Sequence, residues 1–277
     1  MSKVILFVCD ALRDDIAAQH MGYLEHLVEA KKATRWTVIG ELPSMSRPMY
    51  ETLHTGVTSS VHGVVNNSVA RTSIMPNVFK LAVEAGKTTA AAAYYFFSEL
   101  YNRAPYDIVR DFQTDDESLP IQHGRFYRSD EFPDLELFAL GAMLMTRFTP
   151  DYLLIHPGGL DLIGEREGGD SQAYRKQVIY HDDKISSMLP KAHALGYTVL
   201  VTGDHGISDS AAVGVGGVHG GPLAQARRVP LYFLPPDMTG CGRIEEPVSQ
   251  LSVAPTVLSL LGLARPDTMT APVLSAR

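Results

Sequence analysis

The stretch Y-T-V-L-V-T-G-D-H-G, residues Tyr197–Gly206, decides the fold of this chain. Its first seven residues, Tyr197–Gly203, form a short apolar run rich in β-branched side chains, which predicts a buried strand that ends in a turn. Asp204 and His205 follow directly and offer a carboxylate oxygen and an imidazole nitrogen. Open α/β sheets bind their ligands at the carboxyl ends of their strands, and both groups bind metals. The stretch therefore predicts a central strand with a candidate metal site, which needs partner ligands from elsewhere.

Further apolar runs of strand length recur along the chain and alternate with segments of helical periodicity. The helical segments are Tyr174–Met188, with apolar residues four and three apart, Asn77–Ala85, and a last one over Val248–Leu261. Such alternation is typical of a parallel sheet with helices on both faces. We predict a three-layer α/β/α sandwich with a mostly parallel central sheet, in a single domain over residues 1–277. The predicted strands are Val4–Val8, Trp36–Ile39, Thr89–Tyr94, Tyr152–Ile155, Thr198–Thr202 and Val229–Phe233.

Length and composition are those of an ordinary globular protein. The 277 residues are 45% hydrophobic and 20% charged, which is enough for a full core. The net charge is 24 − 31 = −7, so no nucleic acid polymer is expected as a partner. Two cysteines, Cys9 and Cys241, are too few for a disulfide framework. Because we find neither a leader pattern nor an apolar segment of bilayer length, we expect a cytoplasmic protein that does not contact a membrane.

One stretch, Gln113–Asp134, interrupts the alternation. It is polar, acidic and turn-rich, and it carries His123, Arg125, Tyr127 and Arg128. Its composition favours a surface loop, and the alternative is a small lid over the functional site. In the second interpretation Arg125 is a candidate substrate-binding residue.

Candidate partners for Asp204 and His205 lie at three other places. Asp10 closes the first predicted strand, although alone it would more often be a helix N-cap. Asp161 follows a later strand through the turn H-P-G-G-L, and Glu165 lies four residues further on. His219 stands in the glycine-rich loop G-V-G-G-V-H-G-G, which does not match the dinucleotide-binding pattern. Oxygen-rich sets with a few imidazoles suit zinc, manganese or iron, and two neighbouring sets make a two-metal site.

A candidate nucleophile lies in the segment Pro43–Asn67, where a polar turn with Ser44 and Ser46 precedes a short helical stretch. A serine hydroxyl is a poor nucleophile near neutral pH, so it needs a general base or a metal. No G-x-S-x-G elbow surrounds either serine, which argues against an α/β-hydrolase. Activation by a metal fits better.

Taken in order, these motifs resemble the alkaline phosphatase superfamily, and most of all its type I phosphodiesterase/nucleotide pyrophosphatase and phosphonoacetate hydrolase branch. The segment Ser46–Gly56 matches the branch pattern [TS]-x-P-x-x-x-T-L-x-T-G, which implies that Ser46 rather than Ser44 is the nucleophile. The segment His62–Asn67 matches H-G-[IV]-x-x-N, which implies that Asn67 contacts a phosphoryl oxygen. The resemblance extends to the tail at Ser252–Leu263 and covers nearly the whole chain outside the polar stretch.

The resemblance implies two divalent metal ions, zinc first, with manganese or iron as alternatives. The ligands of one ion would be Asp10, Asp204, His205 and Ser46. The ligands of the other would be Asp161, Glu165 and His219. The branch usually has D-x-x-G-H where this chain has D-L-I-G-E, and a carboxylate binds zinc more weakly than an imidazole does. The alternatives are a weak second site, or a contribution from His156 or Glu167.

The resemblance implies a hydrolase that acts on a phosphate ester through a covalent seryl-phosphate at Ser46. A small diester, nucleotide derivative or phosphonate is favoured over a simple monoester. Arg47 and Tyr50 flank Ser46 and are candidate substrate-binding residues, whereas we interpret His54 as a packing residue. A homo-oligomer is one of the oligomeric states that the sequence allows. The motifs do not specify the natural substrate or the metal.

Three alternative functions follow from the same motifs. The first is a non-catalytic metal- or ligand-binding relative, in which Glu165 marks a degenerate second site. The second is a metal-dependent phosphomutase, which usually carries a large cap for which this chain has little room. The third is a sulfatase, which is disfavoured because Met49-Tyr50 stand where the sulfatase pattern has Ser-Arg.

Overall fold

The structure of the chain is a computed structural model that describes residues 3–209 and 216–275. Part of the predicted glycine-rich loop, Gly214 and Val215, lies outside the described residues.

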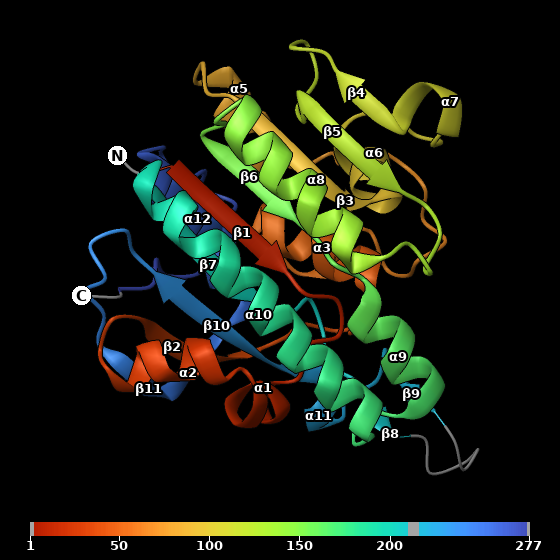
Figure 1. Cartoon of the computed structure of the whole chain (residues 1–277). Coiled ribbons are helices and arrows are strands. Elements are labelled where there is room, and N and C mark those ends of the chain that lie inside the picture. Colours follow the sequence, from red (N-terminus) through yellow and green to blue (C-terminus); the bar gives the residue numbers. More distant parts are fainter. Residues whose placement is uncertain (1–2, 210–215, 276–277) are drawn as a thin grey trace.

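Strands and helices alternate along most of the chain (Figure 1). The strands are β1 Lys3–Val8, β2 Thr34–Ile39, β3 Thr89–Tyr94, β4 Gln113–Asp115, β5 His123–Tyr127, β6 Tyr152–Ile155, β7 Tyr197–Thr202, β8 Ser208–Asp209, β9 Gly217–Val218, β10 Arg228–Leu234 and β11 Gly242–Ser249. The longer helices are α1 Asp14–His20, α2 Gly22–Glu29, α3 Ser46–Thr55, α5 Val78–Glu84, α6 Tyr95–Tyr101, α8 Asp134–Arg147, α9 Gly159–Glu167, α10 Gln172–Ala194 and α12 Val253–Leu261. Short helices are α4 Ser59–His62, α7 Ile108–Asp111, α11 Ala224–Arg227 and the 3-10 turn η1 Gln250–Ser252.

The central sheet of the described residues has nine strands in the order β11-β2-β10-β7-β1-β6-β3-β5-β4. Strand β1 pairs in parallel with β7 and β6, and β3 pairs in parallel with β6 and β5. The reversed strands are β10, which is antiparallel to β7 and β2, and β4, which is antiparallel to β5. The predicted mostly parallel sheet is therefore confirmed.

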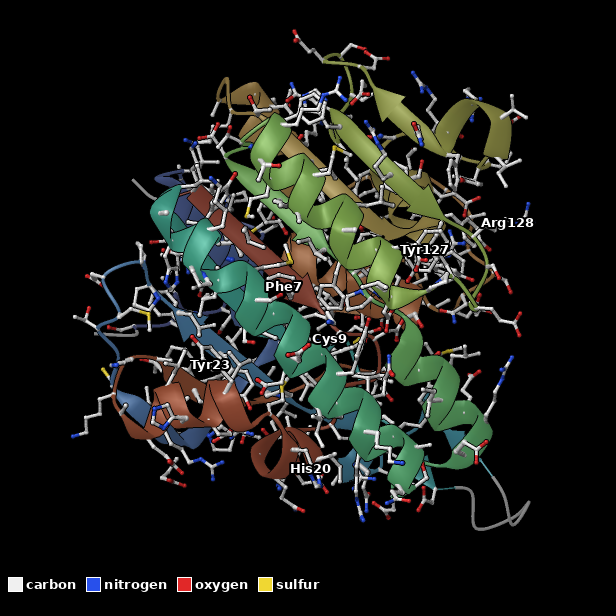
Figure 2. The ribbon with its side chains drawn as sticks, in the orientation of Figure 1. Phe7, Cys9, His20, Tyr23, Tyr127 and Arg128 are labelled. Atoms are coloured by element: carbon white, nitrogen blue, oxygen red, sulfur yellow. The ribbon has the colours of Figure 1, made fainter. Side chains whose placement is uncertain are left out.

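Helices cover both faces of this sheet because its buried strands are apolar on both sides. On β1, Ile5 and Phe7 belong to one core, with apolar residues of α1, α2, α8 and α10. Val4 and Leu6 belong to the other, with residues of α3, α5, α6 and α12. Figure 2 labels Phe7 on β1 and Cys9 just beyond the end of that strand. The predicted three-layer α/β/α sandwich is confirmed.

All six predicted strands are present, with ends shifted by no more than two residues. One helix boundary was wrong: the last helix begins at Val253, whereas Val248 and Ser249 belong to β11. Strand β11 is a polar edge strand whose pairing register with β2 shifts between Ile244 and Val248. Its sequence therefore lacks the clean alternation that identifies a strand.

The polar stretch 113–134 contains two strands that its composition did not indicate. Strand β5 pairs with β3, and β4 forms the sheet edge beyond it. The residues that follow β5 lead into α8 at the carboxyl end of the sheet (Figure 1). A role of this stretch as a lid stays a prediction. None of the helices in the described residues has the length and apolarity needed to cross a membrane.

The carboxyl ends of β1, β7 and β6 lie side by side, because the three strands are neighbours that run in one direction. Directly after β1 the chain turns sharply: Ala11 has φ 62, a left-handed conformation that non-glycine residues avoid. After β7 the chain passes Gly206, where a Cβ atom would lie 2.0 Å from the carbonyl oxygen of Gln225. These two close turns bring Asp10, Asp204 and His205 to the same edge of the sheet.

Candidate active site

Four predicted site residues form a buried group at the ends of β1 and β7. The Nε2 atom of His205 lies 3.4 Å from an oxygen of Asp10 and 3.3 Å from an oxygen of Asp204. The hydroxyl of Ser46 lies 3.3 Å from the same nitrogen. Asp10, Asp204 and His205 could hold a metal ion, because each has a ligand atom within 4.8 Å of the others. We call Asp10, Ser46, Asp204 and His205 the buried group.

Hydrogen bonds with neighbouring backbone and side-chain groups orient the side chains of the buried group. The Nδ1–H of His205 donates to the carbonyl of Gly206 at 2.9 Å, which leaves Nε2 free to accept. The backbone N–H of Ala11 donates to one oxygen of Asp204 at 3.1 Å, and the Tyr50 hydroxyl donates to one oxygen of Asp10 at 2.6 Å. Partners of this kind fix the tautomer and the direction of metal ligands.

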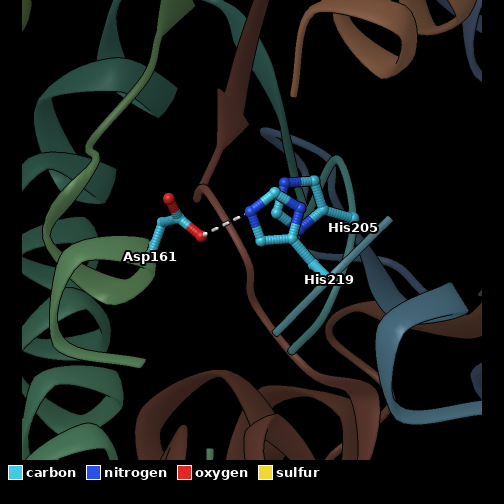
Figure 3. Close-up of side chains that lie close together, drawn as sticks. All are labelled: Asp161, His205 and His219. Atoms are coloured by element: carbon cyan, nitrogen blue, oxygen red, sulfur yellow. Dashed lines mark ion pairs between the residues drawn. The ribbon is translucent and has the colours of Figure 1, made fainter. Parts of the chain in front are cut away.

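A second group lies beside the first and comes from α9 and the segment after β9. The Nε2 atom of His219 lies 3.3 Å from Glu165 and 3.8 Å from Asp161. The ring of His219 stacks on that of His205, with centroids 4.1 Å apart, and its Nδ1–H donates to the carbonyl of Ser44 at 3.2 Å. Figure 3 shows Asp161 facing the two imidazoles. We call Asp161, Glu165 and His219 the rim group. The ligand atoms of Asp161 and His219 lie within 4.8 Å of one another and of His205, whereas Glu165 is not part of that set.

The electrostatics of the site fit a cation between the two groups. Within these two groups, as far as the described residues go, three buried oxygens have no hydrogen-bond partner, and they belong to Asp10, Asp204 and Asp161. Burial, followed by the charge of Asp10, raises the pKa of both Asp204 and Asp161 well above the usual range. Several carboxylates that crowd together in a buried place are costly, and a bound cation would relieve that cost. The donor set of oxygens and imidazoles is one that divalent metals such as zinc or manganese accept.

The histidines of the two groups differ in charge state. Burial, and then the neighbouring imidazole of His219, lower the pKa of His205 to about 3, so that its ring is neutral at pH 7. Burial would also lower the pKa of His219, but the hydrogen bond to Glu165 and the charge of Asp161 raise it to about 9. Burial alone would raise the pKa of Asp10, and the contacts with His156 and His205 lower it instead. The buried group is therefore ready to bind a cation without losing a proton from its histidine.

The nucleophile candidate Ser46 is the first residue of α3. The amide N–H groups of a helix's first turn have no intrahelical acceptor, and they favour an anion. The neighbouring amide of Arg47 is already used, because it donates to the side-chain oxygen of Asn67 at 3.0 Å. That bond leaves the amide NH₂ of Asn67 as a donor, and Asn67 and Ser46 line the same cavity.

The cavity in front of Ser46 has a volume of about 150 Å³ and is predominantly polar. Six of its lining residues are not among the predicted site residues: Tyr94, Phe96, Tyr127, Asp130, Gly158 and Leu162. Tyr94 and Tyr127 close the strands β3 and β5, so the rule that located Asp10 could have found Tyr94. Tyr127 and Asp130 were hidden because β5 was not recognised as a strand.

The remaining candidates lie in different surroundings. Arg47 is buried, with its guanidinium over the ring of Phe96 and paired with Glu99. His54 is buried among aromatic rings and donates to or accepts from the hydroxyl of Tyr152 at 2.9 Å, as a packing residue would. Arg125 lies on the edge strand β5, pairs with Asp115, and does not line the cavity in front of Ser46.

The sequence offers His156 and Glu167 as alternative metal ligands to Glu165. The ring of His156 lies 3.3 Å from Asp10 and 3.1 Å from the Tyr127 hydroxyl, next to the buried group rather than the rim group. Glu167 is exposed at the end of α9 and does not line the cavity in front of Ser46. Glu165 itself lines that cavity and contacts His219.

The sequence profile of the type I phosphodiesterase / nucleotide pyrophosphatase family matches residues 4–219, which include every residue of both groups. The chain belongs to this family. Its fold is also that of several solved structures. Murine ectonucleotide pyrophosphatase / phosphodiesterase 5 superposes with a TM-score of 0.73 over 95% of each chain, at 13% identity. Phosphonate monoester hydrolase from Silicibacter pomeroyi superposes with a TM-score of 0.67 over 99% of this chain and 76% of that one, at 14% identity.

Curated relatives of this family member have diverse activities. The catalytic subunit of GPI ethanolamine phosphate transferase 2 from Homo sapiens is 25% identical over 96% of this chain and 27% of its own length. The 2,3-bisphosphoglycerate-independent phosphoglycerate mutase of Haloquadratum walsbyi is 32% identical over 44% of this chain and 23% of its own length. The chain thus spans about a quarter of the length of these relatives.

Proposed function

We propose that this protein is a metal-dependent hydrolase of phosphate esters that forms a covalent intermediate on Ser46. One observation carries the proposal: the Ser46 hydroxyl lies 3.3 Å from Nε2 of His205. His205 belongs to both sets of potential metal ligands, Asp10–Asp204–His205 and Asp161–His205–His219, and Ser46 lines the cavity beside them. The family match and the structural similarity to a phosphonate monoester hydrolase support a phosphodiester or a phosphonate as substrate.

Each part of the site has a different role in phosphoryl transfer. The Ser46 oxygen attacks phosphorus and forms a P–O bond while the bond to the leaving group breaks, and water later breaks the new P–O bond and frees Ser46. The NH₂ group of Asn67 and the amide N–H of Ser46 hold the non-bridging oxygens, where negative charge is concentrated. Two divalent ions, zinc or else manganese or iron, would be held by the buried group and the rim group and would supply Lewis-acid stabilisation of that charge.

Hydrolysis of aryl phosphate monoesters and diesters tests this proposal directly. Wild type and Ser46→Ala are assayed with added zinc or manganese, and Ser44→Ala serves as the matched control. Ser44 lies two residues away, is also buried, and donates its hydroxyl to the carbonyl of Gly221. We expect Ser46→Ala to lose at least about a thousandfold in kcat, as is typical when a nucleophile is removed. Unchanged activity in Ser46→Ala would contradict the seryl intermediate.

A second candidate function is transfer of the phosphoryl group to an acceptor other than water. The observation that favours it is the similarity to a transferase and to mutases, each of which moves a phosphoryl-containing group. Both reactions share the attack by Ser46 and differ in what frees it. Adding an alcohol to the assay distinguishes them, because a transferase would form the new ester in preference to free phosphate.

We also propose that the segment following β5 borders the substrate site within a single domain. Asp130 lines the cavity in front of Ser46, and Arg128 lines a neighbouring one. Shortening the loop 128–132 is expected to change substrate preference while metal content stays the same. A loss of metal would show instead that the loop supports the structure of the site.

A further inference from the structure

A second cavity adjoins the proposed reaction site at Asn67. Its volume is about 420 Å³, within the range of roughly 300–1,000 Å³ that is common for small-molecule sites. Asn67 lines both cavities, and Tyr95 of the second lies between Tyr94 and Phe96 of the first. The second cavity, which we call the arginine subsite, is lined by Arg47, Asn67, Ser68, Ala70, Tyr95, Glu99, Pro105, Tyr106 and Arg128.

The charges of the arginine subsite leave one cation, Arg128, without an ion-pair partner in the part of the chain that the structure describes. Arg47 and Glu99 are both buried and neutralise each other, with Nη1 and Oε2 2.6 Å apart. The other oxygen of Glu99 accepts the backbone N–H of Tyr106 at 2.9 Å. Arg128 is exposed, and no carboxylate among residues 3–209 and 216–275 lies within ion-pair distance of it. Figure 2 shows Arg128 directly after Tyr127, at the edge of the molecule.

The aromatic rings of the arginine subsite offer little surface for stacking a base. The ring of Tyr95 packs against those of Tyr94, Phe96 and Tyr106, at centroid distances of 4.7, 4.7 and 5.3 Å. The guanidinium of Arg128 lies over the same ring at 5.7 Å. Arg47 lies over the ring of Phe96 at 3.7 Å. Because cations and neighbouring rings already occupy these faces, the subsite is better suited to a small anionic group than to a planar heterocycle.

We propose that the arginine subsite binds the group that remains attached to phosphorus, and that this group ends in an anion such as a carboxylate or a phosphate. The inference rests on the proposed hydrolysis at Ser46 and deepens it by naming a substrate class. Arg128 provides the free guanidinium, and Arg47 with Glu99 forms a rigid wall that positions Asn67 through the amide of Arg47. The substrate is then a small diester, or phosphonate ester, with an anionic arm.

Matched 4-nitrophenyl phosphodiesters test this subsite in the metal-loaded protein. Their second ester group is a 4-carboxybutyl arm, a 2-phosphonoethyl arm, a neutral pentyl arm or thymidine. The quantity compared is the ratio of kcat/KM for an anionic arm to that for the pentyl arm. We expect a ratio of about ten or more in wild type and about a tenfold fall in Arg128→Ala, with Arg128→Lys in between, because lysine keeps the charge but not the planar fork. The two anionic arms show whether a carboxylate or a phosphate is preferred.

Arg147→Ala is the matched control, since Arg147 is also an exposed arginine beside an aromatic ring, with Phe148 at 5.4 Å. It should keep the wild-type ratio. Raising the salt concentration should lower the wild-type ratio, because an exposed charge is screened. A ratio near one, a ratio that Arg128→Ala leaves unchanged, or a preference for the thymidine arm would overturn the subsite while leaving hydrolysis at Ser46 intact. If wild type hydrolyses none of the four diesters, the subsite is overturned, and the aryl phosphate monoester assay with Ser46→Ala decides separately on hydrolysis at Ser46.

Discussion

The buried group and the rim group offer the same kinds of atoms to a metal but hold them differently. In the buried group, Asp204 and His205 have no exposed surface, and each is oriented by the backbone. In the rim group, the side chain of Glu165 is 52% exposed and that of Asp161 is 21% exposed. Ligands that are rigid and dry hold a cation more tightly than ligands that water can replace. The comparison predicts one tight and one weaker metal site.

The largest expected effect comes from removing a ligand of the buried group. Asp204→Asn takes away a buried carboxylate that would be charged when a cation is bound, and the loss of one partner of a buried charge pair costs roughly 3–5 kcal/mol, a factor of about a hundred or more in binding. We therefore expect the first zinc equivalent to bind at least about a hundredfold more weakly, measured by competition with a chelating dye. Zinc affinity within threefold of wild type would show that the buried group is not the tight site.

The next effect is a dependence of the free energy of unfolding on pH. It tests the burial of Glu51, which lies on α3, the helix that begins with Ser46. Burial is the main cause that raises the pKa of Glu51 to about 7, from an ordinary value of 4.5. Its hydrogen-bond donor is Ser73. Below pH 4.5 the carboxyl group is protonated in both the folded and the unfolded state, so it does not make the free energy of unfolding depend on pH. Between pH 4.5 and 7 the unfolded state loses the proton first, so the free energy of unfolding falls as pH rises, by up to about 3 kcal/mol.

Glu51→Gln should remove this decline, as followed by urea denaturation at several pH values. Glu84→Gln is the control, because Glu84 is exposed on α5. The same decline in Glu51→Gln as in wild type would mean that another group causes it.

A smaller effect is expected from removing a hydrogen-bond donor to a ligand of the buried group. Tyr50→Phe deletes the hydroxyl that donates to Asp10 at 2.6 Å while keeping the ring stacked on Phe97 at 4.3 Å. Outer-shell partners of metal ligands are worth roughly 10–100-fold in affinity, and we expect about tenfold weaker zinc binding. Tyr106→Phe, which removes a hydroxyl bonded to the carbonyl of Phe126, is the control. Equal zinc affinities of the two variants would show that Tyr50 does not orient Asp10.

The smallest effect is predicted for the rim group. Glu165→Gln removes an exposed carboxylate whose contact with His219 is open to solvent, and exposed charge pairs contribute only about 0–1 kcal/mol. The second zinc equivalent should bind less than about tenfold more weakly, with the first unchanged. A Glu165→Gln variant that loses the first equivalent would reverse the assignment of the two sites.

The sequence predicts the buried group well because its signals are local. Asp10 and Asp204 each follow an apolar run that can only be a buried strand, and neighbouring parallel strands end at one edge. The motif around Ser46 then adds the nucleophile. Strands β4, β5 and β11 were missed because they lie at or near the edges of the sheet, where polar residues are tolerated and the apolar pattern fades. Tyr127, Asp130 and Arg128 were missed with them, since their place depends on the pairing of β5 with β3.

The arginine subsite could not be predicted from the sequence for a different reason. Its members come from α3, the segment after α4, α6, the segment after α6 and the residue that follows β5, and no spacing along the chain connects them. The pairing of Arg47 with Glu99, which are 52 positions apart in the sequence, is a product of packing between α3 and α6. Charge complementarity of this kind becomes evident only in three dimensions.

Zinc titration of the wild type, Asp204→Asn and Glu165→Gln, with metal content measured after dialysis, tests the central claim most directly. We predict two zinc equivalents per wild-type chain, a tight one that is lost in Asp204→Asn and a weaker one that is reduced in Glu165→Gln. A wild-type chain that binds one equivalent or none, or two equivalents that respond alike to both substitutions, would contradict a two-metal hydrolase with unequal halves.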